Sequence, residues 1–335
     1  MPSACRARAR ELLGDRAADE RARRLVRACR SAIADPTANM TDADLHATLG
    51  RYFSALHECD ADAFHRMWHP RGILLGLGPA GEVVQRDAAT FCEGVVKRGQ
   101  STEYAVHDQI LLVERIDSTC ASAKVRIALP PAPDSPTPTL AATLYTDWLT
   151  LLKDPEVGWR VISKIYSSKP LVDSPALEGV GAIDPADFAA VSAACWDGYV
   201  AAGRACDGAA MARVFHSACN LTFVLPSGVV VVPSKEFCER VATRWSMEVH
   251  APYAHLKDDP RATSCDSLVS IDFAGPNVCR CTLRIGYPPF LYTDVLLLLK
   301  QSQQQGDERA DCAPGWWIVA KSSGNVPFLA DERQL

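Results

Sequence analysis

The sequence holds two copies of one pattern, and this internal repeat limits the fold more than any other feature. In each copy a tyrosine comes first, followed by a Cys-Asp pair, a histidine, a Phe-Cys-Glu triplet, a Leu-Tyr-Thr-Asp segment and, after a Gly-Trp pair, a lysine. The matched positions are Tyr52 and Tyr199, Cys59 and Cys206, Asp60 and Asp207, His69 and His216, Phe91 and Phe237, Tyr145 and Tyr292, Asp147 and Asp294, Trp159 and Trp316, and Lys164 and Lys321. Changes of spacing between the copies fall in loops, most clearly in residues 130–136 and 301–314, so we interpret the chain as two diverged copies of one domain.

These matches set the expected domain boundaries. Residues 41–170 form the first domain, residues 171–183 a linker and residues 184–330 the second domain. Residues 1–40 are an Arg/Ala-rich N-terminal extension, which we interpret as a solvated helix. A mitochondrial-type transit segment is the alternative, although the acidic residues of this extension argue against it.

Charge and hydropathy exclude several classes of protein. No apolar run reaches the roughly 18–20 residues that a membrane-spanning helix needs, and no secretory leader opens the chain, so we expect a cytoplasmic protein with no membrane contact. A net charge of −5 provides no basic surface for nucleic acid. Small molecules or other proteins are the expected partners.

The cysteines and histidines do not predict a metal site. The 13 cysteines are an odd number and contain no CxxC pair, which favours free thiols in a reducing compartment. Cys279 and Cys281 alternate in a strand-like run and point to one face, which makes half of a metal site at most. His65 and His69 lie four residues apart, but Ala212 replaces His65 in the second copy.

Residues 76–81 match the GxGxxG pattern of dinucleotide-binding loops. In those sites a helix follows the glycines and receives the pyrophosphate at its N-terminus. Here a strand-like run, residues 82–85, follows instead, and the second copy has Leu-Pro-Ser-Gly at the equivalent turn. We therefore reject a dinucleotide site and predict no cofactor.

Hydrophobic periodicity places helices before strands in each copy. The first copy should have a long helix starting from a Thr41 N-cap, a short helix from Asp60 to His69 and a hairpin around Gly78. The second copy should repeat this order, with Ser234 as the N-cap of its third helix. Three strand-like runs should end each copy: residues 121–129, 140–153 and 159–166, and residues 278–285, 290–300 and 316–320. This order predicts an α+β fold.

The strand that carries Asp147 holds the most information about function. Alternation puts Tyr145, Asp147, Leu149 and Leu151 on one face, and the same four residue types recur in the second copy whereas the opposite face differs. The identical face should therefore be the inner one. A carboxylate and a phenol on an apolar inner face suit acid–base chemistry on a small hydrophobic substrate, because desolvation raises a carboxyl pKa toward neutrality. The catalytic candidates are Asp147 as base and Tyr145 or His69 as proton donor.

The other candidates would bind a ligand, and several have a structural alternative. The ligand-binding candidates are Trp148, Lys164, Asp294, Tyr292, His216 and Lys321. The alternative for the aspartates is an ion pair that holds the sheet together, with Arg126 or Lys164 in the first copy and with Arg284 or Lys321 in the second. The histidines would instead close the short helices, where a cation favours the helix dipole. Tyr52 and Tyr199 would be core residues.

Three segments of the first copy resemble a known family. They are residues 67–70 (Met-Trp-His-Pro), residues 145–153, and residues 158–166 with their Trp-Arg-Val-Ile-Ser-Lys run. They resemble the SnoaL-like branch of the nuclear transport factor 2 superfamily, whose family description reads "putative lumazine-binding", over nearly all of residues 41–168. The second copy resembles it less closely, since it lacks the proline after His216 and has Val295 where the first copy has Trp148.

The resemblance implies the cystatin-like, nuclear transport factor 2-like architecture: in each copy, a cone of curved antiparallel sheet wrapped around three helices, with a pocket between them. It also implies association through outer sheet faces, either within this tandem chain as a pseudodimer or between chains as a homo-oligomer. The superfamily includes cofactor-free enzymes such as ketosteroid isomerase, scytalone dehydratase and limonene epoxide hydrolase, and also proteins that bind other proteins or small ligands. No catalytic set of these enzymes maps onto this sequence residue by residue, so the fold leaves the function open.

Two functional hypotheses follow. In the first, a cone binds a small hydrophobic molecule and supports lyase, isomerase or hydrolase chemistry with Asp147 as the base. In the second, the chain is a non-catalytic pseudodimer that serves as an interaction scaffold through the loops at 130–138 and 301–314. A cavity that reaches Asp147 would favour the first hypothesis.

Overall fold

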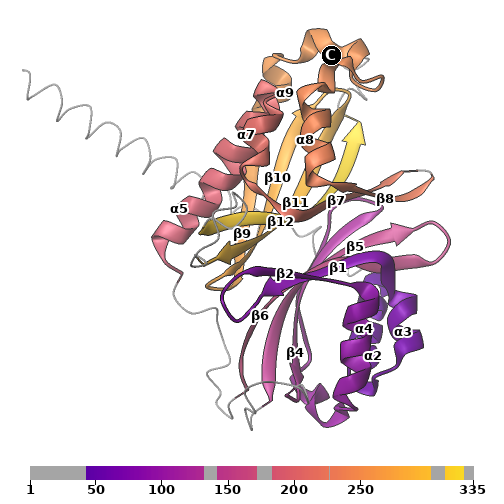
Figure 1. The fold of residues 1–335 in the computed structure, drawn as a ribbon. Coiled ribbons are helices and arrows are strands. Elements are labelled where there is room, and N and C mark those ends of the chain that lie inside the picture. Colours follow the sequence, from indigo (N-terminus) through magenta and orange to yellow (C-terminus); the bar gives the residue numbers. More distant parts are fainter. Residues whose placement is uncertain (1–42, 132–141, 172–182, 226, 303–313, 328–335) are drawn as a thin grey trace, which may run out of the picture.

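The computed structural model describes residues 43–131, 142–171, 183–225, 227–302 and 314–327, which form two domains of the same architecture (Figure 1). The N-terminal extension, the Thr41 N-cap, nearly all of the linker and most of the two loops of the scaffold hypothesis lie outside these residues. Within the described ranges, no helix combines the length and the apolar character needed to cross a bilayer.

Three α-helices pack against the sheet of the first domain. They are α2 (Ala43–Glu58), α3 (Ala61–Met67) and α4 (Ala88–Arg98), with a 3-10 turn, η2 (Thr102–His107), after them. Helix α2 forms because its apolar side chains recur at helical spacing, and the buried ones face the sheet. Helix α3 begins where the Asp60 side chain accepts a hydrogen bond from the Ala63 N–H at 2.8 Å, as a capping aspartate does.

The second domain repeats these helices in broken form. One continuous rod replaces α2 and consists of α5 (Pro185–Ala193), the π-helical η4 (Ala194–Ala201) and α6 (Ala202–Ala205). It is followed by α7 (Gly208–Ala212), α8 (Ser234–Ala242), η5 (Arg244–Ser246), η6 (Ala251–Leu256) and α9 (Pro260–Ser264). Asp207 caps α7 through the Ala210 N–H at 2.8 Å, as Asp60 caps α3.

Three predicted helix boundaries were wrong. The short second helices end at Met67 and Ala212, and His69 lies in the strand that follows. Ser234 is the first residue of α8 and makes no capping hydrogen bond; its hydroxyl instead donates to the His216 carbonyl at 3.4 Å. At the ends of α3 and α7 the chain enters a strand sooner than helical periodicity alone suggests, because the sheet supplies backbone partners.

Each domain has a six-stranded sheet. The first contains β1 (Trp68–Leu77), β2 (Val83–Asp87), β3 (Gln109–Arg115), β4 (Cys120–Leu129), β5 (Thr143–Asp154) and β6 (Gly158–Pro170) in the order β2-β1-β6-β5-β4-β3. The second contains β7 (Phe215–Leu225), β8 (Gly228–Pro233), β9 (Ser267–Gly275), β10 (Val278–Tyr287), β11 (Phe290–Gln301) and β12 (Gly315–Pro327) in the equivalent order. Neighbouring strands are antiparallel except for β1–β6 and β7–β12, which are parallel.

Strands β3 and β9 were not among the predicted runs. Strand β3 leaves Leu111 and Leu112 about 40% exposed, so its sequence lacks the alternation of a half-buried strand. The predicted hairpin around Gly78 is confirmed, with Leu77 paired to Val83. The inner-face prediction is also confirmed, since Leu149 and Leu151 join the core beneath the helices of the first domain.

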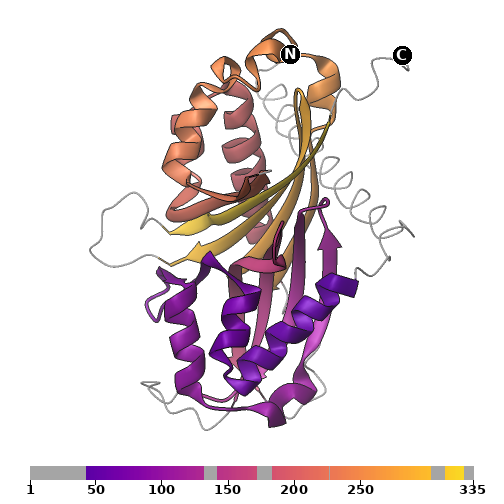
Figure 2. The same cartoon turned by 90° about the vertical axis from the view of Figure 1, so that its right-hand side faces the viewer.

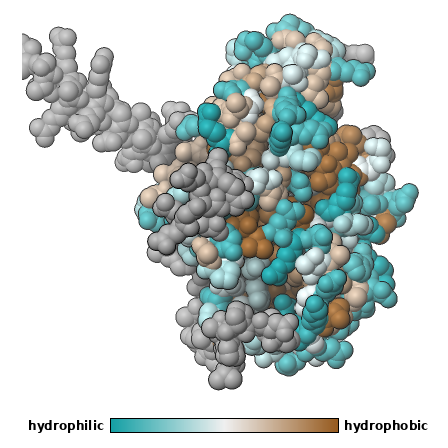
Figure 3. Space-filling model, viewed as in Figure 1, coloured by the Kyte–Doolittle hydropathy of each residue, from teal (hydrophilic) through white to brown (hydrophobic). Residues whose placement is uncertain are grey.

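The two sheets pack against each other through their outer faces, with the helices on the far sides (Figures 1 and 2). A core shared by both domains lies between the sheets and includes Trp148, Ile165, Val295, Leu297 and Val319. On the surface, apolar residues gather near the level at which the domains meet (Figure 3). The chain thus forms an intramolecular pseudodimer.

Charged pairs across this interface repeat with approximate two-fold symmetry. Glu114 of β3 pairs with Arg280, and Asp272, at the same position of β9, accepts a hydrogen bond from Lys124 at 2.7 Å. The ring of Trp148 lies near both cations, 5.4 Å from Lys124 Nζ and 4.9 Å from the Arg280 guanidinium carbon. Equivalent acids of both copies therefore fix the register of the two sheets.

Candidate functional site

A buried cluster of three polar side chains lies inside the first cone. Lys164 Nζ donates to Asp147 Oδ2 at 2.6 Å and to the Tyr52 hydroxyl at 2.7 Å, and the Tyr52 hydroxyl donates to the same Asp147 oxygen at 2.7 Å. Asp147 and Tyr52 are 0% exposed and Lys164 is 4% exposed. Helix α2 supplies the tyrosine, β5 the aspartate and β6 the lysine, so the cluster joins the long helix to the sheet.

The second cone contains the same cluster with one more member. The Tyr199 hydroxyl donates to Asp294 Oδ2 at 2.7 Å, and Lys321 Nζ donates to Asp294 Oδ1 at 3.0 Å. The Ser323 hydroxyl also donates to Asp294 Oδ1, at 2.6 Å, and contacts Lys321. The first copy has Tyr166 at the position of Ser323, so Asp147 has one donor fewer. Asp147 Oδ1 has no hydrogen-bond partner among the described residues.

Burial changes the proton affinities of both clusters. Desolvation lowers the pKa of Lys164, and the attraction of Asp147 opposes this shift. The pKa values of Tyr52 and Tyr199 lie well above 10.0, first because burial disfavours the phenolate and second because the neighbouring aspartate repels it. Both phenols are therefore neutral donors at every physiological pH.

This shift predicts an alkaline limit to stability. A folded-state pKa above the unfolded value means that the contribution of Tyr52 and Tyr199 is complete below pH 10 and is lost as the pH rises beyond it, because the unfolded chain then releases protons that the folded chain keeps. The free energy of unfolding, measured by urea titration at pH 9 and pH 11, should fall between these values. The double variant Tyr52→Phe/Tyr199→Phe should show a smaller fall, and an equal fall would contradict the assignment.

The remaining candidates of the strand lie on two different faces. Tyr145 and Tyr292 are half-buried on the inner face, where Tyr145 packs edge-on against Tyr166 with the ring centres 5.6 Å apart. Burial raises the pKa of Tyr292 to about 12. Trp148 points the other way and is fully buried between the two sheets, so the structure does not bring it to the aspartate.

His69 and His216 make the same local contact in the two copies. Each ring accepts a hydrogen bond at Nδ1, 3.1 Å long, from the backbone N–H two residues later, in Arg71 and Ala218. The register of β1 against β6 shifts just here, between Trp68 and Ile73. Burial, followed by the nearby arginines, lowers the pKa of His69. A ring that holds an irregular strand explains why both copies keep this histidine. No hydrogen bond or ion pair between His69 and Asp147 occurs in the described residues.

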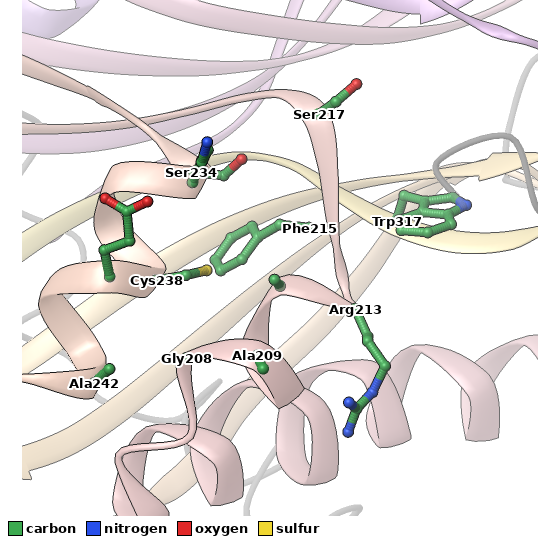
Figure 4. Close-up of a pocket in the computed structure, with 12 residues that line it drawn as sticks. Gly208, Ala209, Arg213, Phe215, Ser217, Ser234, Cys238, Ala242 and Trp317 are labelled. Carbon is green, nitrogen blue, oxygen red and sulfur yellow. The ribbon is translucent and has the colours of Figure 1, made fainter. Parts of the chain in front are cut away.

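The second domain has a cavity at a position that was not predicted. Its volume is about 880 Å³, and it opens between α7, α8 and the start of β7 (Figure 4). Its lining consists of Gly208, Ala209, Ala212, Arg213, Phe215, Ser217, Ser234, Lys235, Cys238, Glu239, Ala242 and Trp317. Neither Asp147 nor Asp294 belongs to this lining.

The cavity arises from a difference between the copies. Where the first copy has His65 and Trp68, the second has Ala212 and Phe215. Trp68 is 1% exposed and stacks on Phe64, with the ring centres 5.3 Å apart, so it fills the space beside its helix. The smaller Phe215 leaves room between α7 and α8, whereas His65 is exposed and fills no such space in the first copy. The change from Trp68 to Phe215 is the sequence signal for this cavity.

Comparison with known proteins agrees with this architecture. The family described as "Putative lumazine-binding" matches residues 40–167 and 186–322. No curated protein matches the chain. Similar solved structures include an NTF-2 like protein of unknown function from Silicibacter pomeroyi, 22% identical, which covers 38% of this chain and 94% of its own with a TM-score of 0.31.

Two further solved structures match about the same share of the chain. A ketosteroid isomerase-like protein from Erwinia carotovora atroseptica is 17% identical and covers 41% of this chain and 99% of its own, with a TM-score of 0.30. A cystatin-like fold protein from Burkholderia xenovorans is 16% identical and covers 40% of this chain and 97% of its own, with a TM-score of 0.29. On the family match, which spans both domains, the chain belongs to the "Putative lumazine-binding" family and carries two tandem copies of its nuclear transport factor 2-like domain.

Proposed function

We propose that the protein binds a small organic molecule in the second domain, in the cavity between α7 and α8. The observation that carries this proposal is the cavity itself, about 880 Å³ in volume, where Phe215 takes the place of the buried Trp68 of the first domain. Cavities of a few hundred to about 1,000 Å³ with an apolar floor and a few polar groups are typical of small-molecule sites. Phe215 and Cys238, both buried, form such a floor.

The lining supports a flat, partly polar ligand. Phe215 and Trp317 offer aromatic surface, and Ser217 and Ser234 offer hydroxyl groups. Arg213 and Lys235 provide positive charge against the single negative charge of Glu239 in this lining, which favours a ligand with an acidic group. The family description names lumazine, a flat bicyclic heteroaromatic compound, and a ligand of that shape suits this lining.

The geometry supports ligand binding better than it supports catalysis. The acid–base role of Asp147 stays a prediction, because both Asp147 and Asp294 are held in buried ion pairs and neither lines the cavity. A general base needs hydrogen-bond reach to a substrate proton. We therefore assign ligand recognition to the cavity and a structural role to the two clusters.

The test combines a ligand screen with a variant whose larger side chain fills the cavity. Purified protein would be screened by thermal shift against pterins including lumazine, aromatic polyketides, steroids, terpenoids and epoxides, and the affinity of any hit measured by calorimetry. Ala212→Trp should weaken binding by roughly tenfold or more, because the indole occupies the cavity.

The matched control is His65→Trp, which adds the same side chain at the equivalent exposed position of the first domain. It should leave the affinity unchanged. Stabilisation by none of these compounds, or an equal affinity of the Ala212→Trp and His65→Trp proteins, would refute the proposed site.

A further inference from the structure

We infer that the second domain also holds a separate site for an oxyanion, a carboxylate or phosphate group of a small molecule, built around Arg204 and Arg244. The site lies at the end of the cone beyond α8, and it does not depend on the ligand proposed above. Two guanidinium groups there share one tyrosine ring. The guanidinium carbon of Arg244 lies 3.8 Å from the ring centre of Tyr287, and that of Arg204 lies 4.5 Å from it.

The cluster has more positive charge than its acids neutralise. Arg244 is only 9% exposed and forms no ion pair within the described part of the chain. Asp266, the acid of this cluster, is already engaged: it accepts from Arg204 Nε at 2.7 Å, from Arg204 Nη2 and from the Gly286 N–H at 3.1 Å. The cluster therefore has one carboxylate, which pairs with the partly buried Arg204, and a second, buried guanidinium without an acid of its own; an unpaired buried charge is costly.

Unpaired hydrogen-bond donors of the two arginines indicate what kind of ligand the cluster would bind. The Nη1 atoms of both Arg204 and Arg244 are buried and have no hydrogen-bond partner among the described residues. Buried polar groups are nearly always paired, so two such donors in one cluster need an acceptor that the chain does not supply. An oxyanion fits because guanidinium groups bind carboxylate and phosphate oxygens with charge-assisted hydrogen bonds.

A second cavity reaches Arg204 of this cluster, although Arg244 is not among the residues that line it. It has a volume of about 420 Å³, is lined by Arg204, Trp245, Ser246 and Lys257 among others, and contains no carboxylate side chain among the described residues that line it. Lys257 lies beside Asp258 at 3.9 Å, an exposed and therefore weak pair, which leaves its charge available to a ligand. An anion in this cavity would lie beside Lys257 and Arg204, which both line it.

The first domain provides an internal comparison. It has Arg98 at the position of Arg244, but His57 replaces Arg204 and contacts Asp108 through Nε2 at 3.0 Å. The pairing between the long helix and the third strand is kept, whereas the second guanidinium is absent. The cationic pair is thus a property of the second copy alone.

The experiment is anion binding to the full-length protein by calorimetry in a chloride buffer. One arm uses inorganic phosphate and pyrophosphate, and the other uses succinate and citrate, so that the arms separate phosphate from carboxylate recognition. We expect saturable binding of one anion per chain in at least one arm. Arg244→Gln should weaken it by roughly tenfold or more, and Lys257→Gln, at an exposed position, by several-fold.

Arg98→Gln is the matched control and should leave the affinity unchanged. Lys257→Gln keeps the test decisive if Arg244→Gln does not fold, since Lys257 makes no buried contact. The inference is overturned if no anion binds saturably, or if Lys257→Gln and every folded Arg244 variant bind as tightly as the unmodified protein.

Discussion

Lys164→Met should lower the free energy of unfolding by about 3–5 kcal/mol, because it leaves the Asp147 carboxylate fully buried with Tyr52 as its remaining donor. A buried ion pair adds little net stability when it is intact, yet removing one partner exposes the desolvation penalty of the other. Chemical denaturation or calorimetry at neutral pH measures the change.

The second domain supplies a matched control for this prediction. In Lys321→Met, Asp294 keeps two hydroxyl donors, Tyr199 at 2.7 Å and Ser323 at 2.6 Å. The loss of stability should therefore be smaller than in Lys164→Met, by about the 1.5–3 kcal/mol that a hydrogen bond to a charged group contributes. An equal fall in the free energy of unfolding in both variants would show that the hydrogen-bond donors remaining on the carboxylate do not determine the destabilisation.

The same cluster decides between the structural and catalytic roles of Asp147. Asp147→Asn keeps the shape but leaves Lys164 without its counter-charge, so a large fall in melting temperature marks the aspartate as structural. A catalytic carboxylate would instead lose turnover on a ligand found in the screen, with the melting temperature nearly unchanged. That second outcome would restore the acid–base prediction.

Trp148→Ala should be the most damaging single substitution at the contact between the sheets, with a loss of about 3–5 kcal/mol. Trp148 is 0% exposed, its ring lies near Lys124 and Arg280, and it belongs to the core that both domains share. Its removal leaves a cavity and takes away a surface on which both cations rest. We also expect the loosened sheets to associate between chains, seen by light scattering as a mass that rises with concentration.

Two controls separate the interface from the rest of the core. Val295→Ala, at the equivalent position of the second copy, removes less volume and should cost clearly less. Trp159→Ala removes the same side chain from the core of the first cone, so it should destabilise the protein without promoting association. Association by both tryptophan variants, or by neither, would contradict a specific role of Trp148 in joining the sheets.

Much of the fold could be predicted because its signals are local and occur twice. The identity of Tyr145, Asp147, Leu149 and Leu151 in both copies identified the inner face of the strand, since alternation along a strand is a property of the backbone. The missed strands and the helix ends at His69 and His216 had a different cause. Their backbone partners lie far along the chain, and the exposed β3 lacks the pattern that burial imposes.

The contacts of the candidate site could be predicted from the sequence only in part. The sequence indicated the inner-facing aspartates and offered two possible cations for each, but the partner depends on strand register: Lys164 reaches Asp147 because β6 lies beside β5. Tyr52 was expected to be a core residue, and its hydroxyl proved to be part of the cluster. The position of the cavity was missed because a cavity depends on the space that neighbouring elements leave unfilled, although Phe215 in place of Trp68 was visible as a change.

By itself, the sequence determined the tandem repeat, the α+β class and the inner face of each sheet, because all three follow from periodicity and from the comparison of one copy with the other. Only the tertiary structure decided that the outer faces join within one chain, that Trp148 is buried between them, and that a cavity opens between α7 and α8 of the second domain. These features depend on how side chains from distant segments fill a shared volume, and the free energy of such packing is not encoded in the order of residues along any one element.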